Sequence, residues 1–354
     1  MLDEHYDVHP FEVGVDVQQS TVGKAAALAK GMARLDRWLR RELPAADAVV
    51  SWFADYHTAL ITARAAPHRT PVLMPLGGYD AMRIPALGYG VFSSRWRAPL
   101  ARAALRRATV LLPVSGSLLR SSNPFGNVGE QGIDLFSPDH APAAVLPTGY
   151  DSEAWPLGEA DRAPSVLSVA TVDSHTTFRR KGLDVLLEVA RRMPDVPFEI
   201  IGLRLPIDEV RSYFAPPNNV TLTAAVPREA LSARYGSASV YLQLSRAEGM
   251  PNVICEAMLC GAIPVGSTAF GIPDAIGDAG VLVRTADPAV IERAIREAFA
   301  MRPGAREAAR AHVVRHFPRS RRREGLTALV GGLSSGYPVR SLVDEVTAWA
   351  PADA

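Results

Sequence analysis

The sequence is short of cysteine, lysine and net charge, and each shortage excludes a class of protein. Its two cysteines, Cys255 and Cys260, are spaced neither as a CxxC redox pair nor as a zinc half-site, so we expect free thiols. Lys+Arg 38 against Asp+Glu 37 leaves a net charge of +1, which argues against a nucleic-acid partner. Among 354 residues only Lys24, Lys30 and Lys181 are lysines, so each of them stands out.

The sequence also shows no pattern that predicts a membrane span or a secretory leader. No stretch approaches the roughly 18 to 20 uninterrupted apolar residues of a spanning helix. The N-terminal segment, MLDEHYDVHPFEV, is acidic where a signal peptide would be basic and then apolar. We therefore expect a soluble, cytoplasmic protein.

What the chain does contain is a pattern typical of α/β proteins. Its 354 residues exceed one typical core, since domains average about 150 residues. From residue 46 onward, short β-branched runs alternate with segments at helical spacing, which predicts parallel strands joined by crossover helices. In the first part we expect strands at 48–52, 71–75, 109–114 and 144–147, helices at 22–41, 56–65, 96–107 and 117–120, and a loop over 123–140.

A second alternating series follows the WPLG segment at 155–158. Its apolar spacing and β-branched runs predict a second wound sheet, joined to the first near residue 156. The expected strands are 165–170, 198–202, 220–223, 240–244, 263–266 and 280–283, and the expected helices are 182–193, 229–238, 253–260 and 288–301.

The most informative segment is VYLQLSRAEGMPNVICEAMLCGAIPVGS, residues 240–267. A strand is followed by a loop with Glu248 and Gly249, Pro251 suits a first helical turn, and Gly261 suits a helix C-cap. In a wound sheet such a loop lies at the carboxyl edge of the strands, where free N–H groups at a helix start can bind phosphate. We therefore expect a phosphate site here.

Glu248 and Glu256 are eight residues apart in this segment, one on the loop and the other about one turn inside the helix. Both can border the same cleft and contact opposite ends of one ligand. The alternative is that Glu248 is an ordinary loop charge and Glu256 a solvated or capping carboxylate. The surrounding residues favour the ligand interpretation.

The segment EGMPNVICEAMLCGAIPVG resembles the E-x7-E signature of the retaining glycosyltransferases of the GT-B fold, family 4 in the carbohydrate-enzyme classification. SVLSVA with RRKGLDVLLEVA upstream, and FGIPDAIGDAGVLV downstream, resemble further segments of that family, and the resemblance extends over residues 45–330. It implies an α/β protein with two Rossmann-like domains facing a cleft: an acceptor-side domain at 1–155 and a nucleotide-sugar domain at 156–318. The helical segment 319–354 would return to complete the first domain.

The resemblance also implies a role for each residue of the signature. Glu248 would face the donor sugar hydroxyls, Glu256 would accept hydrogen bonds from the ribose, and Lys181 with Arg180 would neutralise the leaving diphosphate. Negative charge develops on the diphosphate as it leaves, so fixed cations and a helix start beside it would stabilise the transition state. Neither a metal nor a cofactor would then be required. The alternative for Lys181 is a surface residue at a helix start. The segment that would wrap the diphosphate with backbone N–H groups consists of Gly249, Met250, Pro251, Asn252 and Val253, of which Pro251 has no N–H to donate.

The chain departs from the family pattern in the donor domain. The family usually has an arginine after the first strand of this domain, but Thr171 stands there. Arg179 or Arg180 would substitute, because a guanidinium presents a fork of donors suited to phosphate. Ala224 and Ala225 replace a glycine typical of the contact with the base.

The start of the chain departs further, because MLDEHYDV resembles the segment after the first helix in the family. The resemblance therefore implies that the given sequence begins after the first strand and Gly-rich turn of the acceptor domain. We expect either that the native start lies upstream or that a piece of this domain is absent, and we expect a strand over residues 6–13.

Acceptor-side candidates come from the first domain. Gly78 and Asp80 lie in GGYD, where many relatives carry a histidine, and His57 lies in SWFADYH at another strand end. The alternatives are a Gly-Gly turn capped by Asp80 and a packed histidine at position 57. The remaining histidines have no metal-site spacing, so we expect no metal.

Two basic segments, RLDRWLRREL and SSRWRAPLARAALRR, contain tryptophan and could lie on an anionic membrane. The alternative is a solvated outer face balanced by Asp36 and Glu42. If the acceptor is lipid-linked, the protein would be peripheral at the inner membrane face.

The resemblance thus predicts a retaining glycosyltransferase that moves a sugar from a nucleotide donor to a hydroxyl on a glycan or a lipid-linked acceptor. Two alternatives remain. One is another enzyme on the same scaffold, a sugar-nucleotide epimerase or a phosphorylase; a phosphorylase would need a pyridoxal-linked lysine, for which Lys181 is poorly placed. The other is a non-catalytic nucleotide or carbohydrate binder.

Overall fold

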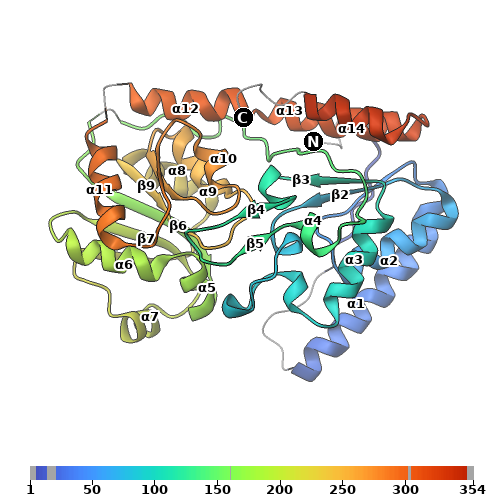
Figure 1. Cartoon of the computed structure of the whole chain (residues 1–354), viewed down its shortest axis with the longest axis horizontal. Helices are drawn as coiled ribbons and strands as arrows, with labels where there is room; N and C mark the ends of the chain where they lie inside the picture. The colour runs from blue at the N-terminus through green and yellow to red at the C-terminus, as the bar shows by residue number, and fades with distance from the viewer. Residues whose placement is uncertain (1–4, 14–20, 160, 302–303, 349–354) are drawn as a thin grey trace.

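The computed structural model describes residues 5–13, 21–159, 161–301 and 304–348, and within them two parallel sheets lie side by side (Figure 1). The first sheet has the order β1-β2-β3, and the second has the order β11-β10-β9-β6-β7-β8. Two short antiparallel strands, β4 (Ser121–Ser122) and β5 (Glu130–Gln131), form a separate ribbon. The fold is α/β, as the alternating pattern predicted.

The first sheet consists of β1 (Val49–Val50), β2 (Val72–Leu76) and β3 (Val110–Pro113). Asp55 begins α2 in a capping box with Thr58, in which each side chain accepts a backbone N–H at the helix start. Buried apolar side chains of α2 and α3 pack on one face of this sheet. The helices of this half are α1 (Thr21–Glu42), α2 (Tyr56–Ala65), α3 (Arg97–Arg107) and α4 (Ile133–Phe136), with 3-10 turns at Leu43–Ala45, Ala66–His68, Tyr79–Ala81, Pro85–Leu87, Val91–Ser93 and Gly116–Leu118.

The second sheet consists of β6 (Val166–Val172), β7 (Phe198–Leu203), β8 (Val220–Ala224), β9 (Val240–Gln243), β10 (Ile263–Ser267) and β11 (Val281–Val283). Its helices are α5 (His175–Arg180), α6 (Leu183–Arg192), α7 (Ile207–Phe214), α8 (Arg228–Ser237), α9 (Asn252–Leu259), α10 (Ile272–Ile276) and α11 (Pro288–Phe299). Side chains of α6 and α11 fill one face of the sheet, and side chains of α8, α9 and α12 fill the other. β9 pairs with β6, so the strand order reverses between them.

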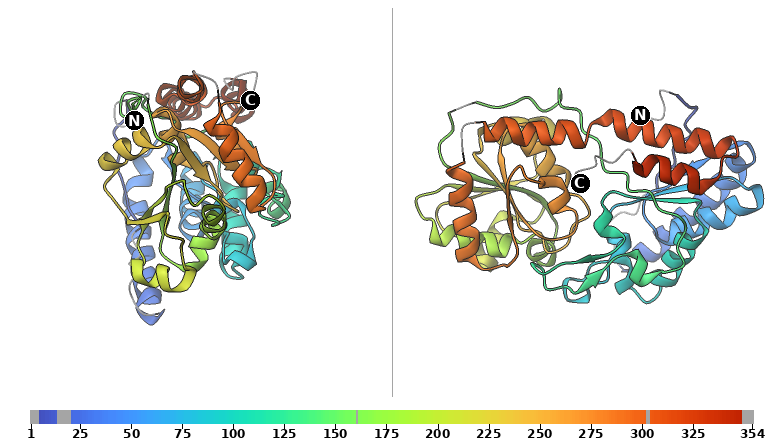
Figure 2. Two further views of the ribbon diagram at one scale, coloured as in Figure 1. Left: turned by 90° about the vertical axis from the view of Figure 1, so that its left-hand side faces the viewer. Right: turned by 45° about the horizontal axis from the view of Figure 1, so that its top comes forward.

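The C-terminal helices cross from the second sheet to the first. α12 (Ala305–His316) packs on α9, and α13 (Arg319–Ser334) continues toward the first sheet, followed by α14 (Val339–Ala348) (Figure 2). Leu326, Leu329 and Val330 of α13 pack on Leu73 and Val110, on the face opposite α2 and α3. The predicted return of this segment is confirmed for the described residues, and 349–354 lie outside them.

Several local predictions were wrong. No strand forms within 5–13; Tyr6 instead donates a hydrogen bond to the carbonyl of Thr327, 3.1 Å away, on α13. Residues 144–147 are not a strand, although the Ala144 N–H bonds the Leu111 carbonyl and one isolated bridge joins residue 143 to β3. The segment 117–120 forms only a 3-10 turn, and the expected loop 123–140 contains β5 and α4. These segments are short, and tertiary contacts decide their conformation.

None of the described helices is long and apolar enough to cross a membrane.

Candidate active site

The point where the strand order reverses brings Lys181 and Glu248 together. Ligands of open α/β sheets bind at the carboxyl ends of the strands at such a point. Lys181 ends α5, the helix after β6, and Glu248 lies in the loop after β9. The Lys181 Nζ lies 2.6 Å from Glu248 Oε2, and the two side chains are 14% and 16% exposed. Gly182 permits the approach: its φ is +71°, and a Cβ there would lie 1.9 Å from the Leu244 carbonyl oxygen.

Arg180 adds a second cation beside Glu248. Its guanidinium lies 4.3 Å from the ring centroid of Tyr89, and its Nη1 donates to the Ala247 carbonyl at 3.3 Å. Burial alone would raise the pKa of Glu248, but the charges of Lys181 and Arg180 outweigh it and hold that pKa below its usual value. These three groups therefore carry one excess positive charge, which suits an anionic ligand.

The start of α9 lies directly after this loop. Pro251 is the N-cap and provides no side-chain cap, so the first N–H groups of α9 have no intrahelical partner. The Tyr150 hydroxyl donates to Asn252 Oδ1 at 2.9 Å, which ties the helix start to residues before the second sheet. Exposed Asn252 and half-buried Val253 border this end of α9, whereas Gly249, Met250 and Pro251 are buried. A helix start beside two cations is an arrangement that binds phosphate.

Glu256 lies on α9 and is only 7% exposed. Its Oε1 lies 3.1 Å from Arg228 Nη2, and its Oε2 accepts a hydrogen bond of 3.4 Å from the Tyr235 hydroxyl. Burial raises the pKa of Glu256, although Arg228 opposes that shift. The Arg228 guanidinium also lies 5.0 Å from the Trp155 ring centroid. Sequence reasoning missed Arg228, Tyr235 and Trp155; the position of Arg228 at a helix start after β8, on the same sheet edge, was the available signal.

The two arginines of RRKG point to different places. Arg179 Nη2 donates to the Tyr213 hydroxyl at 2.9 Å, and its guanidinium lies over Tyr213 and Phe214 of α7. Arg180, not Arg179, therefore accompanies Lys181 at Glu248. Thr171 is exposed near the end of β6, where the register with β7 is irregular.

The two sheets meet through backbone contacts at the GGYD turn. A Cβ on Gly249 would lie 2.0 Å from the Gly77 carbonyl oxygen, and a Cβ on Gly78 would lie 2.8 Å from the Gly249 nitrogen. Two side-chain bonds also cross this seam: Ser115 donates to Asp274 at 2.5 Å, and the Phe270 N–H donates to Asn123 at 2.8 Å. The loop after β9 that carries Glu248 and Gly249 (the donor loop) is thus packed directly on the first domain.

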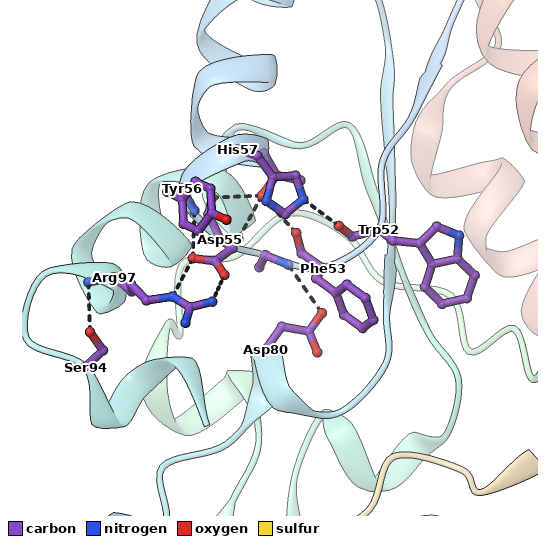
Figure 3. Close-up of polar contacts among 10 residues, drawn as sticks. Trp52, Phe53, Asp55, Tyr56, His57, Asp80, Ser94 and Arg97 are labelled. Carbon is purple, nitrogen blue, oxygen red and sulfur yellow. Dashed lines mark hydrogen bonds and ion pairs between the residues drawn. The ribbon is translucent and has the colours of Figure 1, made fainter. Parts of the chain in front are cut away.

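The acceptor-side candidates have structural partners (Figure 3). Asp80 is 0% exposed; its Oδ1 accepts the N–H groups of Gly77 and Gly78, and its Oδ2 accepts that of Ala54. Burial raises the pKa of Asp80 to about 6, with the three N–H donors opposing the shift. His57 Nε2 lies 2.9 Å from the Trp52 carbonyl. The Asp80 carboxylate therefore holds the turn, as in the alternative interpretation.

Among the residues that the structure describes, no cluster of three or more His, Cys, Asp or Glu side chains could hold a metal ion. Cys255 and Cys260 are both buried free thiols, as expected.

Solved structures with the same architecture define the class of fold. Sucrose-phosphate synthase from Thermosynechococcus elongatus is 16% identical, with a TM-score of 0.68 over 88% of this chain and 79% of its own. Anabaena Alr3699/HepE in complex with UDP-glucose is 14% identical, with a TM-score of 0.62 over 88% of this chain and 84% of its own. A UDP-forming trehalose-phosphate synthase from Burkholderia xenovorans is 14% identical, with a TM-score of 0.62 over 89% and 80%. The fold is the two-domain GT-B fold.

The sequence comparisons identify the second domain more closely. Residues 163–300 match the family model "Glycosyl transferases group 1". A 172-residue segment is 26% identical to one subunit of the phosphatidylinositol N-acetylglucosaminyltransferase of Arabidopsis thaliana, covering 46% of this chain and 38% of that protein. The chain thus spans well under half the length of this curated relative. Residues 163–300, which make up most of the second domain, are thus similar to the group 1 glycosyltransferases.

Proposed function

We propose that this protein is a retaining glycosyltransferase, which transfers a sugar from a nucleotide donor to a hydroxyl acceptor. The observation that carries the proposal is the pairing of Lys181 with Glu248 at 2.6 Å, beside Arg180 and the start of α9, at the switch point of a group 1 domain. The similar Anabaena protein was solved with UDP-glucose, which supports a nucleotide-sugar donor for this chain as well.

In this mechanism the diphosphate lies between Lys181, Arg180 and the N–H groups of Asn252 and Val253. As the bond from the anomeric carbon to the phosphate oxygen breaks, negative charge grows on that oxygen. Fixed cations and helix N–H groups stabilise this charge more in the transition state than in the ground state. The acceptor oxygen bonds the anomeric carbon on the same face, and its proton passes to the departing phosphate oxygen. No separate base, metal or other cofactor is needed for these steps.

Glu248 and Glu256 would hold the two ends of the donor. Glu248 is kept ionised by its two cations and accepts hydrogen bonds from the donor sugar hydroxyls. Glu256 accepts from the ribose hydroxyls, in place of its present bond from the Tyr235 hydroxyl. Arg228, which pairs with Glu256, would border the nucleoside.

The acceptor is a glycan or lipid-linked hydroxyl compound, and the protein works in the cytoplasm at the inner face of the membrane. Support comes from α3 and the residues before it: Trp96 is 54% exposed, Leu100 is 37% exposed, and Arg95, Arg102 and Arg106 are exposed around them. Cationic side chains beside an exposed tryptophan favour anionic lipid headgroups. Sedimentation with anionic and neutral vesicles, in wild type and in Trp96→Ala, tests this part.

The activity is tested by incubating the purified chain with UDP-, GDP- and ADP-sugars and EDTA, and measuring nucleoside diphosphate release with NMR of the first-formed anomer. We expect release from one donor class, unaffected by EDTA and with the donor anomeric configuration retained. Inversion would contradict the retaining mechanism, and loss of activity with EDTA would contradict metal independence. Tight nucleotide binding without any turnover would identify a non-catalytic binder.

A further inference from the structure

Phe53 has a backbone conformation that bulky residues rarely adopt. Its φ is +68°, in the left-handed region, and its side chain remains 42% exposed. Such a conformation is strained, and strained residues of this kind concentrate at functional sites. A glycine would adopt this φ without strain. The presence of phenylalanine at this position therefore indicates that its ring has a function other than stabilising the fold.

The surrounding backbone holds Phe53 firmly in place (Figure 3). Its N–H donates to the Pro75 carbonyl at 3.0 Å, and its carbonyl accepts the Thr58 hydroxyl at 2.9 Å. The next N–H, that of Ala54, bonds the buried Asp80 carboxylate at 3.3 Å. Asp80 thus fixes Phe53 and the GGYD turn with one side chain.

The Phe53 ring lies against the seam between the domains. A Cβ on Gly77 would lie 2.5 Å from Phe53 Cε1, so the ring covers Gly77 closely. The Gly77 carbonyl in turn is the atom that Gly249 of the donor loop approaches. Gly77 therefore lies between the Phe53 ring and Gly249, the residue that follows Glu248 in the loop after β9.

Trp52 extends this aromatic surface. Its indole is 43% exposed, and its centroid lies 5.8 Å from that of Phe53 at an interplanar angle of 52°. Arg322 of α13, itself 6% exposed, lies with its guanidinium 5.2 Å from the indole centroid. Arg322 is fixed by bonds of 2.7 and 2.8 Å to the carbonyls of Leu146 and Pro147. The indole is therefore supported from one side by a buried, anchored cation.

We propose that Trp52 and Phe53 form an aromatic surface that binds a sugar ring of the acceptor and presents its hydroxyl to the donor. This inference rests on the proposed transferase function. The C–H groups of a sugar carry partial positive charge and pack on the electron-rich faces of aromatic rings. The two partly exposed rings are bounded by Arg322 and the polar GGYD turn, and polar groups beside aromatic rings suit a sugar ring with its hydroxyls better than a lipid chain. Proximity to Gly249 places that sugar beside the donor loop.

The test uses Phe53→Gly and Trp52→Ala in the full chain. Phe53→Gly removes the ring and also relieves the strain of the positive φ. A loss of sugar binding in this variant can therefore be assigned to the missing ring and not to a less stable fold. Ala215→Gly is the matched control for backbone strain, since Ala215 has a φ of +45° at the end of α7. Trp96→Ala is the matched control for loss of an exposed tryptophan. Each variant is measured for melting temperature, nucleoside diphosphate affinity and donor hydrolysis without acceptor.

Sugar binding is then measured directly, by saturation-transfer NMR with glucose, galactose, mannose and N-acetylglucosamine in the presence of the nucleoside diphosphate. At least one of these sugars should bind the wild type, with affinity reduced about tenfold or more in Phe53→Gly and Trp52→Ala. Both control variants should bind it normally. Phe53→Gly should melt no lower than the wild type, and nucleotide affinity should be unchanged.

Three results would overturn the inference. The first is that no sugar binds the wild type, or that both aromatic variants bind sugar as well as it does. The second is that lipid vesicles, and not sugars, shield Trp52 and Phe53 from solvent, which would identify the occupant as a lipid. The third is that nucleotide affinity falls together with sugar affinity. Failure of the proposed function is separate, since it appears as absent nucleotide binding and donor hydrolysis in the wild type.

Discussion

The carboxyl edges of the two sheets face each other but are built from different chemistry. The edge of the second sheet carries charge: Lys181, Arg180 and Glu248 beside the start of α9. The edge of the first sheet carries two exposed aromatic rings, Trp52 and Phe53, on a turn held by a buried carboxylate. This difference suggests that the edge of the second sheet binds a diphosphate and the edge of the first sheet binds a sugar ring.

The largest effect should follow from removing the central cation. Lys181→Met leaves Glu248 without its closest partner and the leaving diphosphate without its fixed charge. We expect turnover to fall about 1000-fold, which is about 4 kcal/mol of transition-state stabilisation. The exposed Lys30 on α1 offers a matched control, and steady-state kinetics of Lys30→Met should equal those of the wild type. Equal loss in both lysine variants would contradict a role for the Lys181 charge.

Asp80 provides a test on the other edge through pH. Its folded pKa of about 6 lies above the usual value of 3.8, so the protonated form contributes stability that is complete below the unfolded pKa. This contribution is lost as pH rises through 6, by roughly 3 kcal/mol in total. The free energy of unfolding of the wild type relative to Asp80→Asn should therefore decrease between pH 4 and pH 7. A difference that stays constant over this range would show that the carboxyl is not buried as described.

Contact between the edges can be broken at Gly249. A Cβ there would lie 2.0 Å from the Gly77 carbonyl oxygen, so Gly249→Ala should hold the domains apart. We expect turnover to drop about 100-fold because donor and acceptor are misplaced by about 1 Å. Gly116→Ala is the control, since its added Cβ meets nothing within 4 Å. Steady-state kinetics should show the loss of turnover in Gly249→Ala and not in Gly116→Ala.

A smaller effect should separate the two glutamates of the signature. Glu256 would bind the ribose, which is present in donor and product, whereas Glu248 would bind the transferred sugar. Glu256→Ala should therefore weaken nucleoside diphosphate binding by about tenfold, or 1.4 kcal/mol. Glu248→Ala should act mainly on turnover. Calorimetry in which Glu248→Ala loses more affinity than Glu256→Ala would reverse this assignment.

The sequence predicted the second sheet better than the first for a physical reason. Its strands and the helix α6 have regular apolar patterns, and Leu183, Leu186, Leu187 and Ala190 are all buried as expected. Its site could be predicted from short-range sequence features. The order of Glu248, Gly249 and Pro251 after a strand pattern indicates a loop and a helix start at the edge of the sheet. Residues near in sequence create this half of the site.

The other half depends on contacts between distant residues, which spacing does not reveal. Phe53 has a positive φ because β2 and Asp80 fix its backbone, and Trp52 is supported by Arg322, which is 270 positions away in the chain. The same limit explains Arg228 and Tyr235 beside Glu256, and the choice between Arg179 and Arg180. In each case tertiary packing, not local propensity, decides where the side chain points.

The assignment of the diphosphate to the edge of the second sheet is tested most directly by thermal shift. The melting temperatures of the wild type, Lys181→Met and Phe53→Gly are compared with UDP, GDP and ADP. A nucleotide at 100 times its dissociation constant should stabilise the fold by about 2.7 kcal/mol. We expect one of the three nucleotides to stabilise the wild type and Phe53→Gly equally, and Lys181→Met much less. The absence of any stabilisation of the wild type, or a loss of the shift in Phe53→Gly as complete as in Lys181→Met, would contradict these roles of the two sheet edges.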